Sequence, residues 1–362
     1  MKGRIKMNRK LITLISLVFI ALILVACDKS EKSVTILITD MAGAEVEVPK
    51  NITKVAAVSP STADLMIAFG LGDKIDGVYR TVNDNEWSAI LYPNTVNYYN
   101  YEYDESAESY YSRGVDLILL PDPKTVESLR NSGLTVLNVR QFAPDSFDDY
   151  LFSFSEILRK IFPEVSDKID EWQRRMNKSF DDISAKLTIT EEKPSLYYIY
   201  GDKLNSRGSH LAYTDMPNSF VGSLLRKLNV FFVSENFTSN RPSVEEVLQT
   251  NPDIIVIGGV YQKFLYEELT NDETWNKLAA VVNERVYNIP VGYSPFEQNS
   301  VASPIFMYDL ANKIYPELFD FDIEAMTIET YEYWFNVTLT QEQVNYLLNG
   351  LGPTGNPLVV VK

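Results

Sequence analysis

Residues 55–78, VAAVSPSTADLMIAFGLGDKIDGV, contain the pattern that decides the fold. The β-branched and small apolar residues 55–58 predict a short buried strand, which stops at the Ser-Pro-Ser-Thr segment 59–62. Residues 64–69 then predict a helix that ends at two nearby glycines, and 75–78 predict the next strand. Strand, helix and strand in this order indicate a parallel α/β sheet in which the helix makes the crossover.

The same alternation continues on both sides of this stretch. Upstream, residues 34–39 and 45–48 alternate around the turn-like segment 40–43 and predict a hairpin. Downstream, we expect strands at 115–120, 196–200, 230–233, 254–257 and 285–289, and helices at 219–228, 244–248, 301–315, 324–335 and 341–348. For residues 350–362 we expect no convincing structure.

The clearest helix extends from Glu164 to Leu187. Its apolar residues recur at spacings of three and four: Val165, Ile169, Trp172, Met176, Phe180, Ile183 and Leu187. At 1.5 Å per residue this is a rod of about 36 Å, which packs on a core and joins two lobes as a stiff connection. A single helix bends less than several extended strands, so we expect little opening and closing of a cleft between the lobes.

A repeated spacing within the sequence supports two similar lobes. Glu108 precedes Asp116 by eight residues, Glu245 precedes Asp253 by eight residues, and each aspartate opens a buried-type strand. Two α/β lobes of the same design would produce this spacing. Chance is the alternative, since junctions between a helix and a strand are common.

The composition excludes several classes of function. The net charge of −16 repels nucleic acid, and one histidine with one cysteine cannot assemble the usual zinc sites. The common catalytic and nucleotide-binding motifs, such as G-x-S-x-G and H-E-x-x-H, are absent. We therefore expect a protein that is not an enzyme and carries no cofactor. A membrane-anchored hydrolase that uses His210 is the alternative from another class.

The amino terminus has the anatomy of an export signal. Five basic residues precede an uncharged run, 11–26, that is shorter than the about 20 apolar residues of a spanning helix. The run ends at Leu24-Val25-Ala26-Cys27, which resembles the lipobox of bacterial lipoproteins and implies cleavage before Cys27 and lipidation of its thiol. A buried structural cysteine or an uncleaved anchor is the alternative.

Cleavage at this point leaves about 336 residues, enough for two lobes, and moves the net charge to −21. The mature chain is then expected on the extracytoplasmic face of the cell membrane, held there by its lipid.

Several motifs follow one another in the order found in a known family. They are Thr39-Asp40-Met41-Ala42-Gly43, Val46-Glu47-Val48-Pro49, the segment 54–64, Gly70-Leu71-Gly72-Asp73-Lys74-Ile75, Ser219-Phe220-Val221-Gly222, Asn251-Pro252-Asp253 and Leu339-Thr340-Gln341-Glu342-Gln343. Over residues 36–348 the chain resembles the bacterial solute-binding lipoproteins of ABC importers for siderophores, heme and cobalamin. It departs from them in the tyrosine-rich segment 98–111 and in Val115, which replaces a proline.

The resemblance implies a class III solute-binding protein: an α/β fold of two Rossmann-like lobes with central, mainly parallel sheets, joined by a single long connecting helix. It divides the chain into a signal peptide (1–26), a tether (27–33), an N-terminal lobe (34–145), a connecting helical segment (146–190), a C-terminal lobe (191–320) and a C-terminal helical extension and tail (321–362). It also implies a monomer that captures an iron complex, a ferric siderophore or heme, and works with a permease and its ATPase. A molybdate- or tungstate-type oxyanion and cobalamin are the alternative ligands.

The first group of candidate ligand residues follows strands of the N-terminal lobe. Ser59, Ser61 and Thr62 come after the first strand of the sheet, where hydroxyl and N–H donors can meet an anionic oxygen. Simple capping of the next helix is the alternative for all three. Arg80 follows the next strand and can grip a carboxylate or siderophore oxygen, with a surface salt bridge as the alternative.

The second group lies in the tyrosine-rich segment and in the C-terminal lobe. Tyr103 is close to the position where some heme-binding relatives place an axial ligand, and plain aromatic packing is its alternative. Tyr200, Arg207 and His210 follow the strand 196–200, and Ser294 and Glu297 are expected at the rim of the cleft.

The resemblance finally assigns permease docking to Glu108 and Glu245. In the family a glutamate on each lobe meets arginines of the permease, so that both lobes are registered at once. Solvated glutamates with no such role are the alternative.

Overall fold

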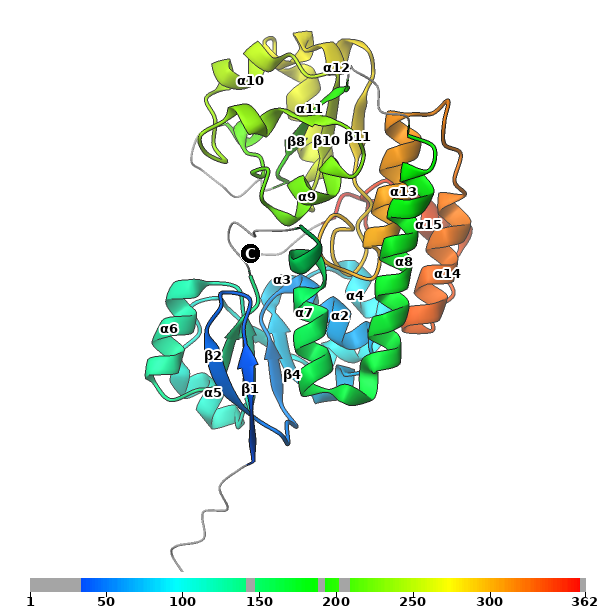
Figure 1. The fold of residues 1–362 in the computed structure, drawn as a ribbon. Helices are drawn as coiled ribbons and strands as arrows, with labels where there is room; N and C mark the ends of the chain where they lie inside the picture. The colour runs from blue at the N-terminus through cyan, green and yellow to red at the C-terminus, as the bar shows by residue number, and fades with distance from the viewer. Residues whose placement is uncertain (1–33, 141–146, 188–192, 202–208, 359–362) are drawn as a thin grey trace, which may run out of the picture.

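The computed structural model describes residues 34–140, 147–187, 193–201 and 209–358. They form two α/β lobes, which Figure 1 shows one above the other, with the long helix α8 (Ser166–Ser184) running along one side of both. The predicted signal peptide, the tether and Cys27 lie outside the described residues.

The N-terminal lobe is built on a five-stranded sheet in the order β5-β4-β3-β6-β7. Its strands are β3 (Val55–Ala57), β4 (Ile75–Tyr79), β5 (Tyr99–Tyr101), β6 (Leu117–Leu120) and β7 (Val136–Asn138), and each adjacent pair is parallel. The helices between them are α2 (Pro60–Ala68), α3 (Arg80–Asn83), α4 (Glu86–Leu91), α5 (Ala107–Arg113) and α6 (Pro123–Asn131). The predicted hairpin is present as β1 (Thr35–Thr39) and β2 (Glu45–Pro49), paired antiparallel.

The C-terminal lobe has a four-stranded parallel sheet in the order β11-β10-β8-β9. Its strands are β8 (Ser195–Ile199), β9 (Phe231–Phe232), β10 (Ile254–Ile257) and β11 (Val286–Asn288), with helices α9 (Phe220–Arg226), α10 (Val244–Thr250), α11 (Gln262–Asn271) and α12 (Ala279–Val282). The chain ends with α13 (Ser303–Ile314), α14 (Ile323–Phe335) and α15 (Gln341–Leu348). The predicted parallel α/β class is therefore confirmed.

The connecting helix is present but shorter than predicted: α8 spans Ser166–Ser184 instead of 164–187, and Phe180 and Leu187 of the predicted face are only half-buried. Ile169, Trp172, Met176 and Ile183 have no exposed surface, and the indole Nε1 of Trp172 donates to the carbonyl of Ser300 at 3.0 Å. A second helix, α7 (Phe147–Ile161), precedes α8; it lies within the predicted connecting helical segment 146–190, but its bounds were not predicted.

One predicted helix begins earlier than its pattern indicated. We expected a start at Asp64, but α2 begins at Pro60. Proline is well accommodated in a first helical turn, because that turn has no intrahelical partner for its N–H.

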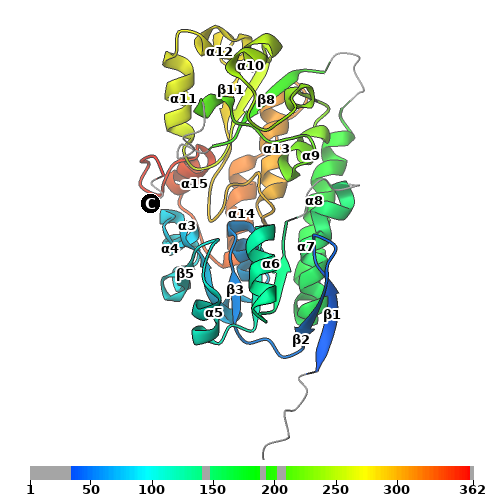
Figure 2. The ribbon, with the colours of Figure 1, turned by 90° about the vertical axis from the view of Figure 1, so that its left-hand side faces the viewer.

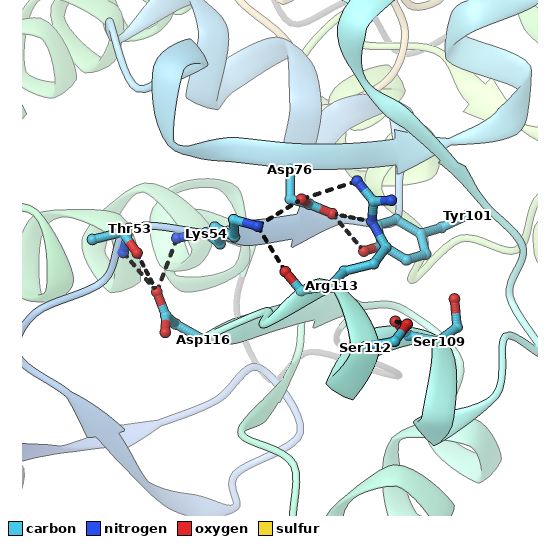
Figure 3. Close-up of polar contacts among 8 residues, drawn as sticks. All are labelled: Thr53, Lys54, Asp76, Tyr101, Ser109, Ser112, Arg113 and Asp116. Atoms are coloured by element: carbon cyan, nitrogen blue, oxygen red, sulfur yellow. Dashed lines mark hydrogen bonds and ion pairs between the residues drawn. The ribbon is translucent and has the colours of Figure 1, made fainter.

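The repeated glutamate–aspartate spacing corresponds to the same hydrogen-bond arrangement in both lobes. Oδ2 of Asp116 accepts from the N–H and hydroxyl of Thr53 and from the N–H of Lys54, at 2.8–2.9 Å. Oδ2 of Asp253 accepts from the N–H and hydroxyl of Ser195 at 2.8 and 2.7 Å. In each lobe the aspartate before a central strand thus fixes the start of the neighbouring strand, as Figure 3 shows for Asp116.

We expect both aspartates to stabilise their sheets. Asp116→Ala removes the acceptor of three hydrogen bonds, which predicts a loss of about 1–3 kcal/mol in the free energy of unfolding, and Asp253→Ala predicts a similar loss. Urea denaturation followed by circular dichroism measures it. The matched control is Asp104→Ala at an exposed position after β5, expected within about 0.5 kcal/mol of the parent chain. An Asp116→Ala effect as small as that of the control would contradict this role.

Candidate functional site

The carboxyl ends of the strands of both sheets lie at the junction of the lobes. Ser61, after β3, donates its hydroxyl to Oε1 of Gln298 at 3.2 Å. Asp64 of α2 accepts from the N–H of Val301 at 3.0 Å. The segment 289–302, which follows β11 in the C-terminal lobe, therefore reaches the helix that follows β3 in the N-terminal lobe.

Ser59 and Thr62, the other two candidate hydroxyl residues, are less available to a ligand than expected. Ser59 is the N-cap residue of α2, but its side chain makes no capping hydrogen bond, and Thr62 is only 3% exposed. Of the three predicted hydroxyls, that of Ser61 is the one with a hydrogen bond to the segment 289–302.

Arg80 is held by carboxylates of its own lobe. Its Nε lies 2.5 Å from Oε1 of Glu102, and Nη1 lies 3.5 Å from Oδ2 of Asp84. The structure therefore contains the salt bridge given above as the alternative. A ligand carboxylate would have to compete with Glu102 for this guanidinium.

Two pairs of tyrosines stand at the strand ends of the two lobes. On the N-terminal lobe, Tyr103 stacks face to face on Tyr79, with ring centroids 4.1 Å apart and planes at 8°. On the C-terminal lobe, Tyr200 packs on Tyr213 at 4.6 Å, and the guanidinium of Arg241 lies 3.8 Å from the Tyr213 ring. Tyr103 is 37% exposed, and desolvation of its phenol on the covered side, together with the neighbouring Tyr79, raises its pKa above the usual range.

Arg140, which sequence reasoning missed, is the cation whose charge acts on both lobes. Burial raises the pKa values of Tyr103 and Tyr200, and the positive charge of Arg140 opposes both shifts. Burial also raises the pKa of Asp215 to about 6, again against the charge of Arg140. Arg140 follows β7, and the run Val136-Leu137-Asn138 was the signal that could have located it.

After burial, the negative charge of Asp215 contributes most to raising the pKa of Tyr200, and the ionised forms of Tyr213 and Tyr103 raise it further. We call Tyr79, Tyr103, Arg140, Tyr200 and Asp215 the interlobe cluster.

Ser294 and Glu297 do not lie at a rim. They are 2% and 1% exposed, because the segment 289–302 folds inward against the N-terminal lobe. Oε1 of Glu297 accepts from the N–H of Gly259 at 2.9 Å and from the hydroxyl of Tyr198 at 3.3 Å, while Oε2 has no hydrogen-bond partner. Burial raises the pKa of this carboxyl to about 7, although those hydrogen bonds lower it.

His210 is held at the outer helix layer of the C-terminal lobe. Its Nδ1 lies 3.1 Å from Oε2 of Glu268, and its ring packs edge-on against Phe264, both on α11. Within the described residues no group of three or more His, Cys, Asp and Glu side chains is arranged to hold a metal ion. Arg207 lies outside the described residues.

Glu108 and Glu245 occupy matching places. Each is exposed and lies in the first turn of a short helix, α5 or α10, whose N-cap serine accepts a hydrogen bond from the backbone. In Figure 1 both helices lie on the side of the molecule away from α8.

The charged network in Figure 3 anchors the carboxyl end of α5 to the sheet of the N-terminal lobe. Arg113, the last residue of α5, binds Asp76 of β4 at 2.6 and 3.1 Å, and Nζ of Lys54 donates to the Arg113 carbonyl at 2.7 Å. Tyr101 donates to the same carboxylate at 2.8 Å. Glu108 is therefore carried on a helix whose far end is fixed to the sheet.

In the stretches that the model describes, no helix is both long enough and apolar enough to cross a membrane.

Comparison with known proteins relates this geometry to one family. A sequence model described as periplasmic binding protein matches residues 163–291, from the start of the connecting helix through the C-terminal lobe. The chain is 24% identical over 298 residues to an uncharacterised ABC transporter substrate-binding lipoprotein, YvrC, of Bacillus subtilis (strain 168), covering 78% of this chain and 87% of that protein.

Solved structures share the fold at low sequence identity. One is the molybdate periplasmic binding protein MolA of Haemophilus influenzae, with molybdate bound: TM-score 0.71, 15% identity, 84% of this chain and 99% of that one. Another is CeuE of Helicobacter pylori with Ni(II) bound: TM-score 0.69, 18% identity, 86% of this chain and 99% of that one. These likenesses confirm the two-lobed fold with its connecting helix.

The buried carboxyl of Glu297 predicts a pH dependence of stability. Its pKa of about 7 in the folded chain lies above the about 4.3 of an unfolded glutamate, so its contribution falls as the pH rises from about 4 through about 7. Glu297→Gln keeps an acceptor for Gly259 and should flatten this fall by up to about 1.4 kcal/mol per pH unit. Chemical denaturation at several pH values measures the slope.

Glu267→Gln, at an exposed position on α11, is the control and should leave the slope unchanged. A Glu297→Gln slope equal to that of the parent chain would show that this carboxyl does not titrate in the window.

Proposed function

We propose that this chain, an ABC-transporter solute-binding protein of the periplasmic binding protein type, captures a ferric siderophore between its lobes and delivers it to a permease. Proteins of this type are binding proteins and not enzymes, and they work with a permease and its ATPase. The observation that carries the proposed ligand is the interlobe cluster: tyrosine pairs pack at the strand ends of both lobes, and the positive charge of Arg140 lowers the pKa values of Tyr103 and Tyr200 against the effect of burial.

The chemistry of the cluster suits an aromatic, anionic chelate. The Tyr79–Tyr103 and Tyr200–Tyr213 pairs offer ring faces and edges to the aryl groups of a ligand. A guanidinium binds paired oxygen atoms of a carboxylate or catecholate through two parallel hydrogen bonds. A ferric chelate with aryl groups and a net negative charge meets both requirements.

Heme fits the described residues less well. Ligation of ferric heme by Tyr103 would require its ring to leave the face-to-face stack on Tyr79, whose centroid is 4.1 Å away. His210, the single histidine, is engaged by Glu268 on the outer helix layer. Ligation of heme by Tyr103 or by His210 would therefore require each side chain to give up its present contact.

A compact oxyanion is also disfavoured. Such a site needs N–H and hydroxyl donors with little competing negative charge. Here Asp215 belongs to the cluster, and its charge acts on Glu297, whose buried carboxyl lies against Tyr198. These carboxylates, when ionised, would repel any anion between the lobes, an anionic chelate included, but only the chelate gains compensating contacts between its aryl groups and the tyrosine pairs.

The proposed delivery step uses Glu108 and Glu245. The two carboxylates are exposed on matching helices of the two lobes and can form salt bridges with arginines of a permease. We also propose lipidation at Cys27, which would keep the receptor close to the permease and so raise its effective concentration there.

A ligand screen tests the proposal. We expect a ferric tris-catecholate to raise the melting temperature more than heme, cyanocobalamin, molybdate or a ferric trihydroxamate, since a ligand at 100 times its dissociation constant stabilises a fold by about 2.7 kcal/mol. Arg140→Gln should weaken that binding about ten-fold or more, and Arg140→Lys less. Arg226→Gln, at a half-exposed position on α9, is the control and should bind like the parent chain.

Stabilisation by heme with a Soret band that is lost in Tyr103→Phe or His210→Ala would replace the siderophore with heme. Stabilisation by molybdate alone would replace it with an oxyanion.

Uptake tests the docking residues separately. In cells that contain the cognate permease and ATPase, Glu108→Lys and Glu245→Lys should each lower uptake, and the double variant should lower it further, because the salt bridges become repulsions. Ligand affinity of the purified variants should stay unchanged. Glu127→Lys, on the exposed face of α6, is the matched control. Unchanged uptake in the double variant would contradict the docking role.

A further inference from the structure

We propose that the end of the chain is a latch that fastens the C-terminal lobe to the N-terminal lobe at helix α4. The latch consists of residues 349–358, which follow α15. In Figure 2 the red end of the chain lies between α11 above and α3 and α4 below, on the flank opposite α8. The proposal concerns the mechanics of the fold and does not depend on the identity of the ligand.

The first contacts of the latch are made with the C-terminal lobe. The carbonyl of Asn349 accepts from Nδ2 of Asn288, the last residue of β11, at 3.1 Å. Gly350 lies so close to Gln262 that an added Cβ would come within 2.6 Å of Oε1. Gln262 is itself buried and donates to the carbonyls of Gly259 and Ile289 at 2.8 and 2.7 Å. The latch therefore begins against the strand ends of β10 and β11.

The next contacts are made with the N-terminal lobe. The carbonyl of Leu351 accepts from Nε1 of Trp87 at 2.8 Å, and this tryptophan of α4 has no exposed surface. Gly352 packs against Glu86, since an added Cβ would lie 2.7 Å from Oε2. Leu358 is buried in the main hydrophobic core. Within a few residues the chain thus passes from one lobe to the other.

The latch has a defined structure of its own. The N–H of Gly352 donates to the carbonyl of Asn356 at 2.7 Å, and Leu351 pairs with Pro357 in an antiparallel bridge. Gly350 and Gly355 adopt φ values of 66° and 78°, which glycine accepts at little cost. The expectation of no convincing structure over 350–362 is therefore wrong for the described residues 350–358, whose turns and bridge carry no apolar periodicity.

The segment 289–302 also forms hydrogen bonds with the start of helix α4. Nδ2 of Asn85, the N-cap residue of α4, donates to the carbonyls of Gly292 and Tyr293 at 2.8 and 3.3 Å. On the opposite flank the lobes are joined by α8. Rotation of one lobe about α8 would separate the latch from α4, so the latch limits that motion.

Distance measurements between the lobes test the latch. The chain has a single cysteine, so the mature chain carrying Cys27→Ser can be labelled selectively at Glu127→Cys on α6 and Glu267→Cys on α11. We expect double electron–electron resonance to give one narrow distance distribution. Truncation after residue 348 should broaden it and shift it to longer distances, whereas truncation after Leu358 should not. A distribution unchanged by the longer truncation, in a chain that remains folded, would overturn the proposal.

A second variant decides the matter if the longer truncation does not fold. Trp87→Phe keeps a buried aromatic ring, removes the donor to Leu351 and also removes part of the buried indole volume, which the same substitution at Trp275 controls for. Loss of one hydrogen bond of about 1 kcal/mol predicts amide exchange about five times faster within 349–358. Trp275→Phe, in the core of the C-terminal lobe, is the matched control and should not act selectively there. Exchange in 349–358 that is equal in Trp87→Phe and the parent chain would overturn the latch.

Discussion

Parallel strands place all their carboxyl ends at one edge of a sheet, and the candidate site depends on two such edges being held against each other. The starts of neighbouring central strands are fixed in the same way in both lobes, by Asp116 at Thr53 and by Asp253 at Ser195. The opposite edges then carry Tyr79 and Tyr200, on strands β4 and β8 or directly after them. The lobes therefore share this hydrogen-bond arrangement as well as parallel sheets. The site lies where the carboxyl ends of the two sheets meet.

Three connections hold those edges at the junction. Helix α8 runs along one side, the segment 289–302 crosses to Asn85, and the segment after α15 reaches Trp87. Helix α8 and the segment 289–302 make buried hydrogen bonds, through Trp172 and Asn85, and the bond of Trp87 to Leu351 is partly buried; such bonds are costly to break when no water replaces them. A junction held in this way favours a binding region that is largely formed before the ligand arrives, consistent with the small lobe motion expected from a helical connection.

Periodicity predicted the parts of the fold that depend on local patterns. The alternating hairpin, the strands around Ala56 and Val256, and the amphipathic helix containing Trp172 are each visible in a single window of sequence. Elements with few apolar residues or an unusual composition were missed. Strand β5 lies in a tyrosine-rich stretch, and α4 spans only Glu86–Leu91.

The candidate site was less predictable than the fold. Placing residues after strand ends located Tyr200 and Ser61, because strand direction alone determines the edge at which they lie. Tyr103 was proposed from the resemblance, since strand β5 before it was not predicted. It could not show that Glu102 engages Arg80, that Glu268 holds His210, or that Glu297 is buried, since these outcomes depend on contacts between distant segments. Arg140 was missed because the short strand β7 before it was not recognised.

The central claim is that the ligand binds where the carboxyl edges of the two sheets meet. Hydrogen–deuterium exchange of the purified chain, with and without a ferric tris-catecholate, measures this most directly. The account predicts slower exchange in both lobes at residues 59–62, 101–104, 139–140 and 199–201, and no change at the opposite edge, at 53–54 and 194–195. Protection that is absent from these strand ends, or confined to one lobe, would contradict it.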